Sequence, residues 1–331
     1  MSEFPAASER TLQRHCKWVH VHEGLWLVDE YGITKGNRAK FVAYPDPPDA
    51  PIQKPPYRYY WKESLRRYPL EFWAEVLAYH IGAVMGVRVP PCFPATYTGM
   101  DGNEELPVRV GSLSLSLVEP RKEEELLHGG DLLSEIKADY DRKKGSDHSV
   151  QLIIEALREL IGNVSLYREF FRQLVFDSLI GNTDRHQDNW GVKFYWIGEG
   201  EAFSMLPAFD NGTSLGRELT EAKVHSCLRN AVELEAFINR GTAHVRWDEG
   251  GVLEQVTHEE LMRRHLVTFP KSRETFAEII EFDEAALKRA VRRVCLLSRQ
   301  AQEGLTVELS EQREEFIIRV ILRRRERLRT L

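Results

Sequence analysis

The sequence predicts an α+β protein with two lobes, a smaller strand-rich lobe followed by a larger helix-rich lobe. Residues 16–120 are rich in Val, Tyr, Trp and Phe and contain one helical segment. From about residue 130, apolar residues recur mainly at helical spacing. At 331 residues the chain is long enough for two lobes with separate cores. We assign residues 1–120 to the N-lobe and 121–331 to the C-lobe, with the acidic stretch PRKEEELLHGGDLL (120–133) as connector.

The N-lobe is predicted from short strands rich in β-branched and aromatic residues. These candidate strands are KWVHVHEGLWLVDE, AKFVAY, YRYYWKE and GSLSLSLVE. The proline-rich stretch YPDPPDAPIQKPPY cannot form a helix or a central strand, so it is a loop between two strands. LEFWAEVLAYHIGAVMG has apolar residues at helical spacing, and Gly86 closes this predicted helix.

The C-lobe is predicted from longer amphipathic segments. The expected helices are VQLIIEALRELIG, LYREFFRQLVFDSLIG, HEELMRRHL, DEAALKRAVRRVCLLSRQAQ and SEQREEFIIRVILRRRERL. Two strand-like pieces, GVKFYW and FSMLPAF, lie between the helical blocks.

Composition limits the possible classes of protein. The chain is 42% hydrophobic and 29% charged, with a formal charge of −6 that argues against a dedicated nucleic-acid binder. Its one basic cluster, RRRERLR at 323–329, ends a predicted helix. Cations suit the negative end of the helix dipole, so we expect a solvated helix end rather than a binding patch.

Cysteines and apolar runs bear on location. The four cysteines are far apart and form no CxxC pair, which argues against a zinc site or disulfide framework. The N-terminus lacks an apolar signal-peptide core, and no stretch approaches the roughly 18 apolar residues of a membrane span. The sequence predicts a soluble, cytoplasmic protein that binds no membrane.

The stretch LIGNTDRHQDNWGV at 179–192 is the main candidate for chemistry. It could be a polar turn after a helix, or a catalytic loop. Asp184 and Asn189 are five residues apart, so one could meet a substrate hydroxyl while the other holds a metal. Asp210 follows 21 residues after Asn189, after an apolar strand and before a glycine turn, where it could be a second oxygen ligand for Mg²⁺. Asp188 is expected to face solvent.

A phosphate-binding cation is expected upstream of this loop. Lys62 lies in the aromatic strand YYWKES, and Glu71 and Glu75 follow on one face of the next helix. A strand lysine paired with a helix glutamate can direct an ammonium group at nucleotide phosphates. Lys62 could also be an ordinary edge-strand lysine. YGITKGNRAK at 31–40 could present backbone N–H groups to phosphate, or could be a plain hairpin turn.

The motifs IGNTDRHQDNWGV, LPAFD and EFWAEVLAYHIGAVMGVRVP together resemble the HipA-like bacterial serine/threonine kinases, distant relatives of phosphatidylinositol 3-kinase-like enzymes. The resemblance covers roughly residues 30–300 and is most specific at 179–216. It implies a two-lobed protein-kinase-like fold of the short, stand-alone type, with ATP and Mg²⁺ in the cleft.

The resemblance also implies roles for individual residues. Asp184 would be the catalytic aspartate, His186 would support the loop, and Asn189 and Asp210 would hold magnesium. Lys62 would contact the α/β-phosphates, with Glu71 as its expected partner because of its spacing to the LA dipeptide at 77–78. Gly36 would belong to the glycine-rich loop, and Glu119 would lie at the hinge that meets adenine.

The proline-rich insertion at 45–56 leaves Lys54 and Lys40 as alternatives to Lys62. Some relatives phosphorylate a serine of their own glycine-rich loop, where the nearest hydroxyl here is Thr34. The expected substrate is a protein serine or threonine, and family resemblance suggests a toxin-like role with a neutralising, antitoxin-like partner. A lipid or small-molecule kinase and a nucleotide-binding pseudokinase remain as alternatives.

Overall fold

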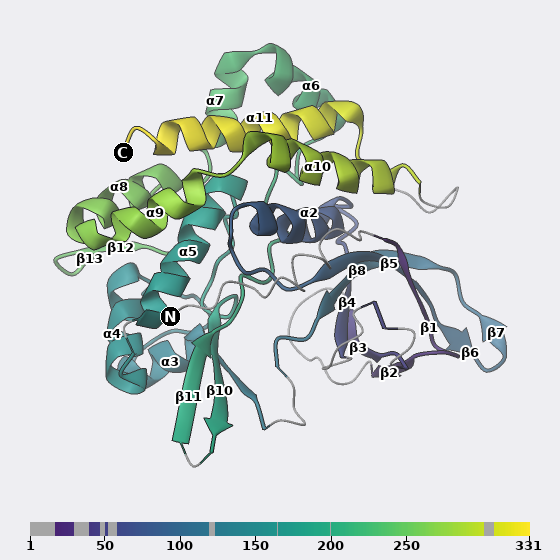
Figure 1. Cartoon of the computed structure of the whole chain (residues 1–331), viewed down its shortest axis with the longest axis horizontal. Helices are drawn as coiled ribbons and strands as arrows, with labels where there is room; N and C mark the ends of the chain where they lie inside the picture. The colour runs from purple at the N-terminus through teal and green to yellow at the C-terminus, as the bar shows by residue number, and fades with distance from the viewer. Residues whose placement is uncertain are drawn as a thin grey trace.

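The computed structural model describes residues 17–29, 40–46, 50–51, 58–118, 123–163, 165–198, 200–300 and 308–331. A strand-rich part and a helix-rich part lie side by side, with helix α2 (Glu71–Val84) between them (Figure 1). The predicted order of a strand-rich lobe followed by a helical lobe is confirmed. The predicted boundary at 120/121 falls outside the described residues and stays a prediction.

The N-terminal part is built on a six-stranded sheet with the order β1-β5-β8-β4-β3-β2. Its pairs are antiparallel except β1 with β5, which is parallel. The strands are β1 (Val19–His22), β2 (Leu27–Asp29), β3 (Lys40–Tyr44), β4 (Tyr59–Glu63), β5 (Cys92–Thr98) and β8 (Arg109–Leu115). One face carries an aromatic core in which Phe41 stacks on Trp61 with ring centroids 4.8 Å apart and Tyr97 packs against both.

The alternation of side chains places polar groups on the other face of β4. Trp61 is fully buried, whereas its neighbours Tyr60 and Lys62 point to the opposite side and are only partly buried. Lys62 is paired across the strands with Lys40 of β3 and Ser112 of β8. This polar face is the one that meets the helical part.

Strand β5 does not figure among the predicted strands, although it lies between β1 and β8. Its sequence CFPATYT follows two prolines and contains Pro94, and proline is normally excluded from central strands. Burial overrides that local preference, because Phe93, Ala95 and Tyr97 all join the aromatic core. A short hairpin, β6 (Met100–Asp101) with β7 (Glu104–Glu105), extends from its end.

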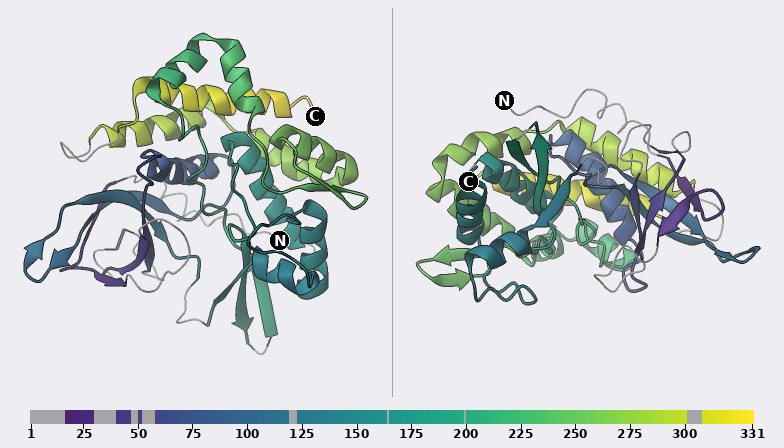
Figure 2. Two further views of the ribbon diagram at one scale, coloured as in Figure 1. Left: turned by 180° about the vertical axis from the view of Figure 1, so that it is seen from behind. Right: turned by 90° about the horizontal axis from the view of Figure 1, so that it is seen from below.

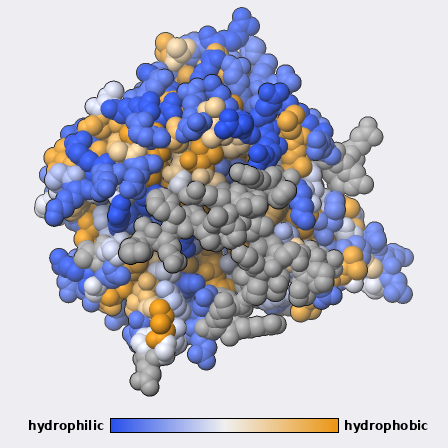
Figure 3. All heavy atoms as spheres, viewed as in Figure 1, coloured by the Kyte–Doolittle hydropathy of each residue, from blue (hydrophilic) through white to orange (hydrophobic). Residues whose placement is uncertain are grey.

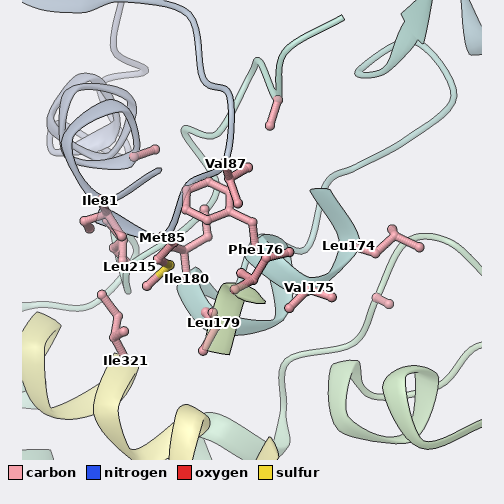
Figure 4. Packing of buried hydrophobic residues seen from close by; sticks show 14 of the residues in the cluster. Ile81, Met85, Val87, Leu174, Val175, Phe176, Leu179, Ile180, Leu215 and Ile321 are labelled. Atoms are coloured by element: carbon pink, nitrogen blue, oxygen red, sulfur yellow. The ribbon is translucent and has the colours of Figure 1, made fainter. Parts of the chain in front are cut away.

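Helix α2 matches the predicted segment 70–86 and is buried almost all round. It contacts β5 and β8 on one side and α10 (Glu284–Ser298) on the other, and Figure 1 and the left view of Figure 2 place it between them. Gly86 has a positive φ of 66° and ends the helix. In Figure 4, Ile81 of α2 and Met85, which directly follows α2, point toward the apolar residues of α5 (Ser165–Ile180).

The C-terminal part consists mainly of helices around one large apolar core. Besides α5 and α10 they are α3 (Gly129–Ile136), α4 (Val150–Ile161), α6 (Glu221–Arg229), α7 (Ala231–Asn239), α8 (His258–Thr268), α9 (Arg273–Ile280) and α11 (Glu311–Leu328), with a 3₁₀ turn at Pro270–Ser272. The five predicted helices of this lobe are confirmed as α4, α5, α8, α10 and α11. Hydrophilic side chains predominate over α6 and α7, at the top of the view in Figure 3.

Three strands form a small sheet in the order β11-β10-β9: β9 (Glu125–His128), β10 (Gly191–Ile197) and β11 (Gly200–Met205). A separate hairpin joins β12 (Trp247–Glu249) and β13 (Val252–Glu254). The expectation of a plain connector at 120–133 is therefore wrong from residue 125 onward, because β9 pairs with β10 and α3 begins directly after it. Among the residues described, no helix is both long and apolar enough to cross a membrane.

Candidate active site

The loop 181–190 joins α5 to β10, and its backbone is held tightly at both ends. Gly181 adopts a positive φ of 69°, and both Gly181 and Asn182 donate their N–H groups to the carbonyl of Asp177. At the far end, Asn189 N–H donates to the carbonyl of His186 at 2.9 Å. The polar residues after α5 thus form an ordered turn.

Asp184 and Asn189 are brought together by this turn. The side-chain amide of Asn189 donates from Nδ2 to the backbone carbonyl of Asp184 at 2.7 Å, which directs its Oδ1 the other way. The Asp184 N–H in turn donates to Oδ1 of Asn182 at 3.2 Å. Asn189 is buried, whereas Asp184 is partly exposed. The loop therefore presents one partly exposed carboxylate beside one fixed amide oxygen.

Arg185 is a functional residue that the sequence interpretation missed. It is 1% exposed and forms a two-point ion pair with Asp177 of α5, with N···O distances of 2.9 and 2.8 Å. Burial opposes the charge, but the carboxylate of Asp177 raises the pKa of Arg185 above its ordinary value. The only sequence signal was an arginine inside a loop that follows a buried helix.

The remaining donors of Arg185 hold two loops together. Its Nη1 donates to the carbonyl oxygens of Asn189 and Phe209, and its Nη2 donates to Oδ1 of Asn211 at 2.7 Å. One buried guanidinium thus fixes the loop 181–190 against the segment 209–211, which carries Asp210.

Asp210 lies shortly after β11 and has an unusual backbone conformation. Its φ is 56°, in the left-handed region that aspartate tolerates better than most residues. The next N–H, from Asn211, donates to Oε2 of Glu75 at 2.9 Å. At Gly212, an added Cβ would lie 2.8 Å from the Cγ of Glu71, so glycine allows α2 to pass close by. Helix α2 and the Asp210 turn are therefore locked to each other.

Lys62 reaches this cluster from β4. Its Nζ lies 3.3 Å from Oδ1 of Asp210 and 3.9 Å from Oε1 of Glu75. The predicted pairing of Lys62 with Glu71 is wrong, because Glu71 pairs with Arg217 at 3.0 Å. Glu75 lies one helical turn, about 6 Å, farther along α2, and that displacement brings it opposite β4.

Three further candidates for the nucleotide site cannot be placed. Gly36, Glu119 and the alternative lysine Lys54 lie outside the described residues. Lys40, the other alternative, is the cross-strand neighbour of Lys62 and shares its face of the sheet. The ion pairs to Glu75 and Asp210 distinguish Lys62.

A cleft opens between the polar face of the sheet and the Asp210 turn. It encloses about 420 Å³ of empty space, its mouth included. Its lining combines the charged groups Lys62, Glu75 and Asp210 with the largely apolar residues Tyr60, Val89, Pro90, Cys92, Ser114, Leu115, Leu117, Phe209 and Asn211. An apolar wall that ends at an ammonium group suits a ligand with a flat ring at one end and phosphates at the other.

A group of histidines adjoins the loop 181–190. The His244 ring contacts His186 edge-on with centroids 5.9 Å apart, and its Nδ1 lies 3.5 Å from Nδ1 of His148. The indole N–H of Trp190 donates to Nε2 of His148 at 2.9 Å. Sequence reasoning missed His148 and His244, because they are distant from the loop in the chain.

These contacts fix the protonation pattern of the histidines. Burial lowers the pKa of His148 well below its ordinary value, so its ring is neutral near pH 7. Because its Nε2 accepts from Trp190, its proton lies on Nδ1 and is donated to His244. Burial also lowers the pKa of His244, against the opposing effect of Asp184. A neutral His244 therefore carries its proton on Nε2.

Asp188 and His186 complete the loop. Asp188 faces solvent only in part, since its side chain is 29% exposed and Arg142 donates to its Oδ1 from Nε at 3.0 Å and from Nη2 at 2.6 Å. His186 accepts from the Asp188 N–H at its Nδ1, 3.1 Å away. These contacts brace the loop against the segment that carries Arg142.

The residues present fit a divalent cation with oxygen preference. Asp210 offers a carboxylate, and Oδ1 of Asn189 accepts no hydrogen bond from the described residues. Carboxylate and amide oxygens are ligands that Mg²⁺ prefers, with phosphate oxygens completing the shell. Within the described ranges, no cluster of three His, Cys, Asp or Glu side chains could hold a metal by itself.

Comparison of the sequence with known protein families identifies a family for this chain. The sequence model described as "HipA-like C-terminal domain" matches residues 34–257, more than half of the chain. No curated protein sequence matches. Among solved structures, the Helicobacter pylori proinflammatory kinase CtkA is 18% identical with a TM-score of 0.65, over 93% of this chain and 95% of that one.

Two other solved structures are more distant. The Golgi casein kinase with Mn/ADP bound is 12% identical with a TM-score of 0.40, over 97% of this chain and 75% of that one. Hydra Fam20 with sugar is 15% identical with a TM-score of 0.41, over 97% and 87%. The resemblance to CtkA shows a two-lobed, kinase-like fold. The chain belongs to the HipA-like C-terminal domain family.

Proposed function

We propose that this chain is an ATP-dependent protein kinase that transfers the γ-phosphate of ATP to a serine or threonine hydroxyl. One observation carries the proposal: a single buried guanidinium, Arg185, ties the loop of Asp184 and Asn189 to the turn of Asp210, where Lys62 and Glu75 converge. Phosphoryl transfer depends mainly on positioning and charge, which such an arrangement supplies.

The cleft provides the nucleotide site. Adenine would lie against the apolar wall formed by Val89, Leu115 and Phe209, and its phosphates would extend toward Lys62. Glu75 and Asp210 hold that ammonium in place. Asn189 and Asp210 would hold Mg²⁺, which supplies positive charge that neutralises the phosphate oxygens.

Asp184 would act on the substrate. The substrate hydroxyl oxygen bonds to the γ-phosphorus while the bond from that phosphorus to the bridging oxygen of ADP breaks, and Asp184 accepts the hydroxyl proton. His186 and its partner Arg142–Asp188 keep the loop in shape. ADP and a phosphorylated side chain are the products.

Family membership supports the same conclusion, and one structural relative is described as a kinase. We extend the proposal to a cytoplasmic location, to autophosphorylation, and to a toxin-like role that a neutralising partner protein would control. Each of these extensions requires its own test.

The first experiment is the intact mass of the purified protein after incubation with Mg²⁺ and ATP. We expect a phosphate adduct on the wild type and none on Asp184→Ala. Asp188→Asn is the matched control, because it removes a carboxylate of the same loop that pairs with Arg142 rather than serving the cleft. It should retain the adduct, because the amide oxygen of asparagine can still accept from Arg142 and hold the loop.

Other outcomes point elsewhere. An AMP adduct would replace phosphoryl transfer with nucleotidyl transfer. If no adduct forms, phosphorylation of a cell extract and of phosphoinositides is measured in parallel, and transfer to lipid alone would contradict the protein-kinase proposal. ATP binding unchanged by Asp184→Ala, with no turnover on any acceptor, would indicate a pseudokinase.

A further inference from the structure

The basic cluster 323–329 is not the solvated helix end that its sequence predicts. Arg324 and Arg325 are both 7% exposed. Arg325 pairs with Glu284 at 3.1 Å, and Arg327 pairs with both Glu235 and Glu259. Arg324 forms no ion pair with any carboxylate of the described residues. The end of α11 therefore buries one positive charge that has no ion-pair partner among the described residues, with Glu218 as the carboxylate whose charge acts on it.

The surroundings of Arg324 leave its hydrogen-bonding capacity mostly unused. Its one hydrogen bond within the described ranges goes from Nη1 to the carbonyl of Leu179 at 3.4 Å, and the Phe237 ring lies 5.7 Å from its Cζ. The guanidinium lies between two glycines, since an added Cβ would come within 2.3 Å of it at Gly181 and within 4.0 Å at Gly241. A guanidinium has five donors, and burying it without acceptors costs free energy.

Arg324 borders a cavity between α7, α8 and α11. The cavity has about 360 Å³ of empty space, its mouth included, and Ser178, Asn239, Gly241, Thr257 and His258 contribute to its lining. Thr257 caps α8, so the positive end of that helix dipole faces the same space. Arg324 and the N-terminus of α8 thus direct positive potential into the same cavity.

His258 adds an independent sign of a missing ligand. It is 8% exposed, and its Nε2 has no hydrogen-bond partner among the described residues. Burial, assisted by the nearby Arg324, lowers the pKa of His258 to about 3. A bound anion would reverse the effect of Arg324 on this ring and give its second nitrogen a partner.

The one carboxylate at the cavity does not cancel this potential. Glu259 contributes to the lining, but Arg327 donates to its Oε2 from Nε at 2.6 Å. Arg327 also binds Glu235 and Asn239, so these charges satisfy one another. Among the described residues of this group, Arg324 is left without an ion pair.

We propose that the cavity between α7, α8 and α11 binds a small tetrahedral oxyanion of the phosphate class, through Arg324, His258 and the N-terminus of α8. The site lies behind the catalytic loop, because Arg324 packs on Gly181, the first residue of that loop. It is separate from the nucleotide cleft and does not depend on the proposed kinase activity.

The test is isothermal titration of the full chain with inorganic phosphate, in a buffer without phosphate or sulfate. We expect saturable binding that Arg324→Gln weakens by about tenfold or more, because a charge-assisted interaction is lost. The matched control is Arg319→Gln on the same helix, where the side chain is exposed and already paired with Glu315. It should bind phosphate like the wild type.

Two further measurements keep the result decisive. Lys62→Met should leave phosphate binding unchanged; if it abolishes binding while Arg324→Gln does not, the phosphate lies in the nucleotide cleft and the proposal fails. Should Arg324→Gln not fold, the ring resonances of His258 in the wild type must shift on phosphate addition. If phosphate does not bind, or if the ring resonances of His258 do not shift, the proposal fails. Arg324 would then serve only to cap the C-terminal end of α5. Loss of kinase activity has no bearing on any of these outcomes.

Discussion

Replacing Arg185 should destabilise the protein and disable the loop that it positions. In Arg185→Leu, Asp177 would be left as a buried carboxylate without its counter-ion, since both side chains of the pair are 2% exposed. Breaking a buried pair in this way costs about 3–5 kcal/mol, a large share of the roughly 5–15 kcal/mol that stabilises a typical domain. Arg185→Lys keeps the charge but cannot reach all four partners, and the loss of two or three hydrogen bonds should cost about 2 kcal/mol.

Urea unfolding gives these differences directly, and phosphoryl transfer is measured where each variant is fully folded. Turnover of Arg185→Lys should fall, because the loop 181–190 and the segment 209–211 lose their common anchor. Arg142→Lys is the control: its pair with Asp188 is about 30% exposed, so its loss should cost less than about 1 kcal/mol. Equal losses of stability in the two lysine variants, with wild-type turnover in Arg185→Lys, would refute this reasoning.

Three other predictions concern the cleft and the histidines. Glu75→Gln should lower kcat/KM for ATP by about tenfold, because Lys62 loses the charge that orients it, whereas Glu71→Gln should have a smaller effect. Steady-state kinetics with varied ATP measure both variants, and equal effects would contradict the pairing of Lys62 with Glu75. His244→Ala should lower kcat about tenfold without changing KM for ATP, because the loop loses the ring that packs on His186; steady-state kinetics should show that His244→Gln, whose amide oxygen can accept from His148, restores part of that loss. Burial lowers the pKa of His265 to about 3 in the folded state, below the unfolded value of 6.5, so the unfolded chain binds more protons and stability falls as pH drops below 6.5. Going from pH 7 to 5 should cost about 2 kcal/mol through this residue, and urea unfolding should show a pH-dependent loss smaller by that amount in His265→Phe.

Much of the secondary structure follows from local pattern. Apolar spacing in the sequence predicts five helices that bury one or more faces: α2, α4, α5, α10 and α11. The strands with alternating aromatic residues can be predicted from the sequence in the same way. Strand β5 and the pair β9 and α3 cannot be predicted in this way. Strand β5 contains a proline and β9 follows a run of acidic residues, so only contacts with neighbouring elements stabilise these segments.

The sequence by itself determined which reactive side chains the site contains. Asp184, Asn189 and Asp210 stand in an order typical of phosphoryl transfer, and a strand lysine precedes them. Which glutamate meets Lys62 was decided by the tertiary structure, because a shift of one helical turn is invisible in a repeating pattern but moves a carboxylate by about 6 Å.

Charge pairing was likewise decided only by tertiary structure. Arg185 and Arg324 are both arginines in polar stretches, yet one is buried against Asp177 and the other has no carboxylate partner among the described residues. Their partners lie on elements far away in the chain, and the free energy of a buried charge depends on those partners rather than on sequence neighbours. The sequence therefore determined which groups are available for chemistry, and the packing of distant elements determined which of them are held, neutralised or left to bind a ligand.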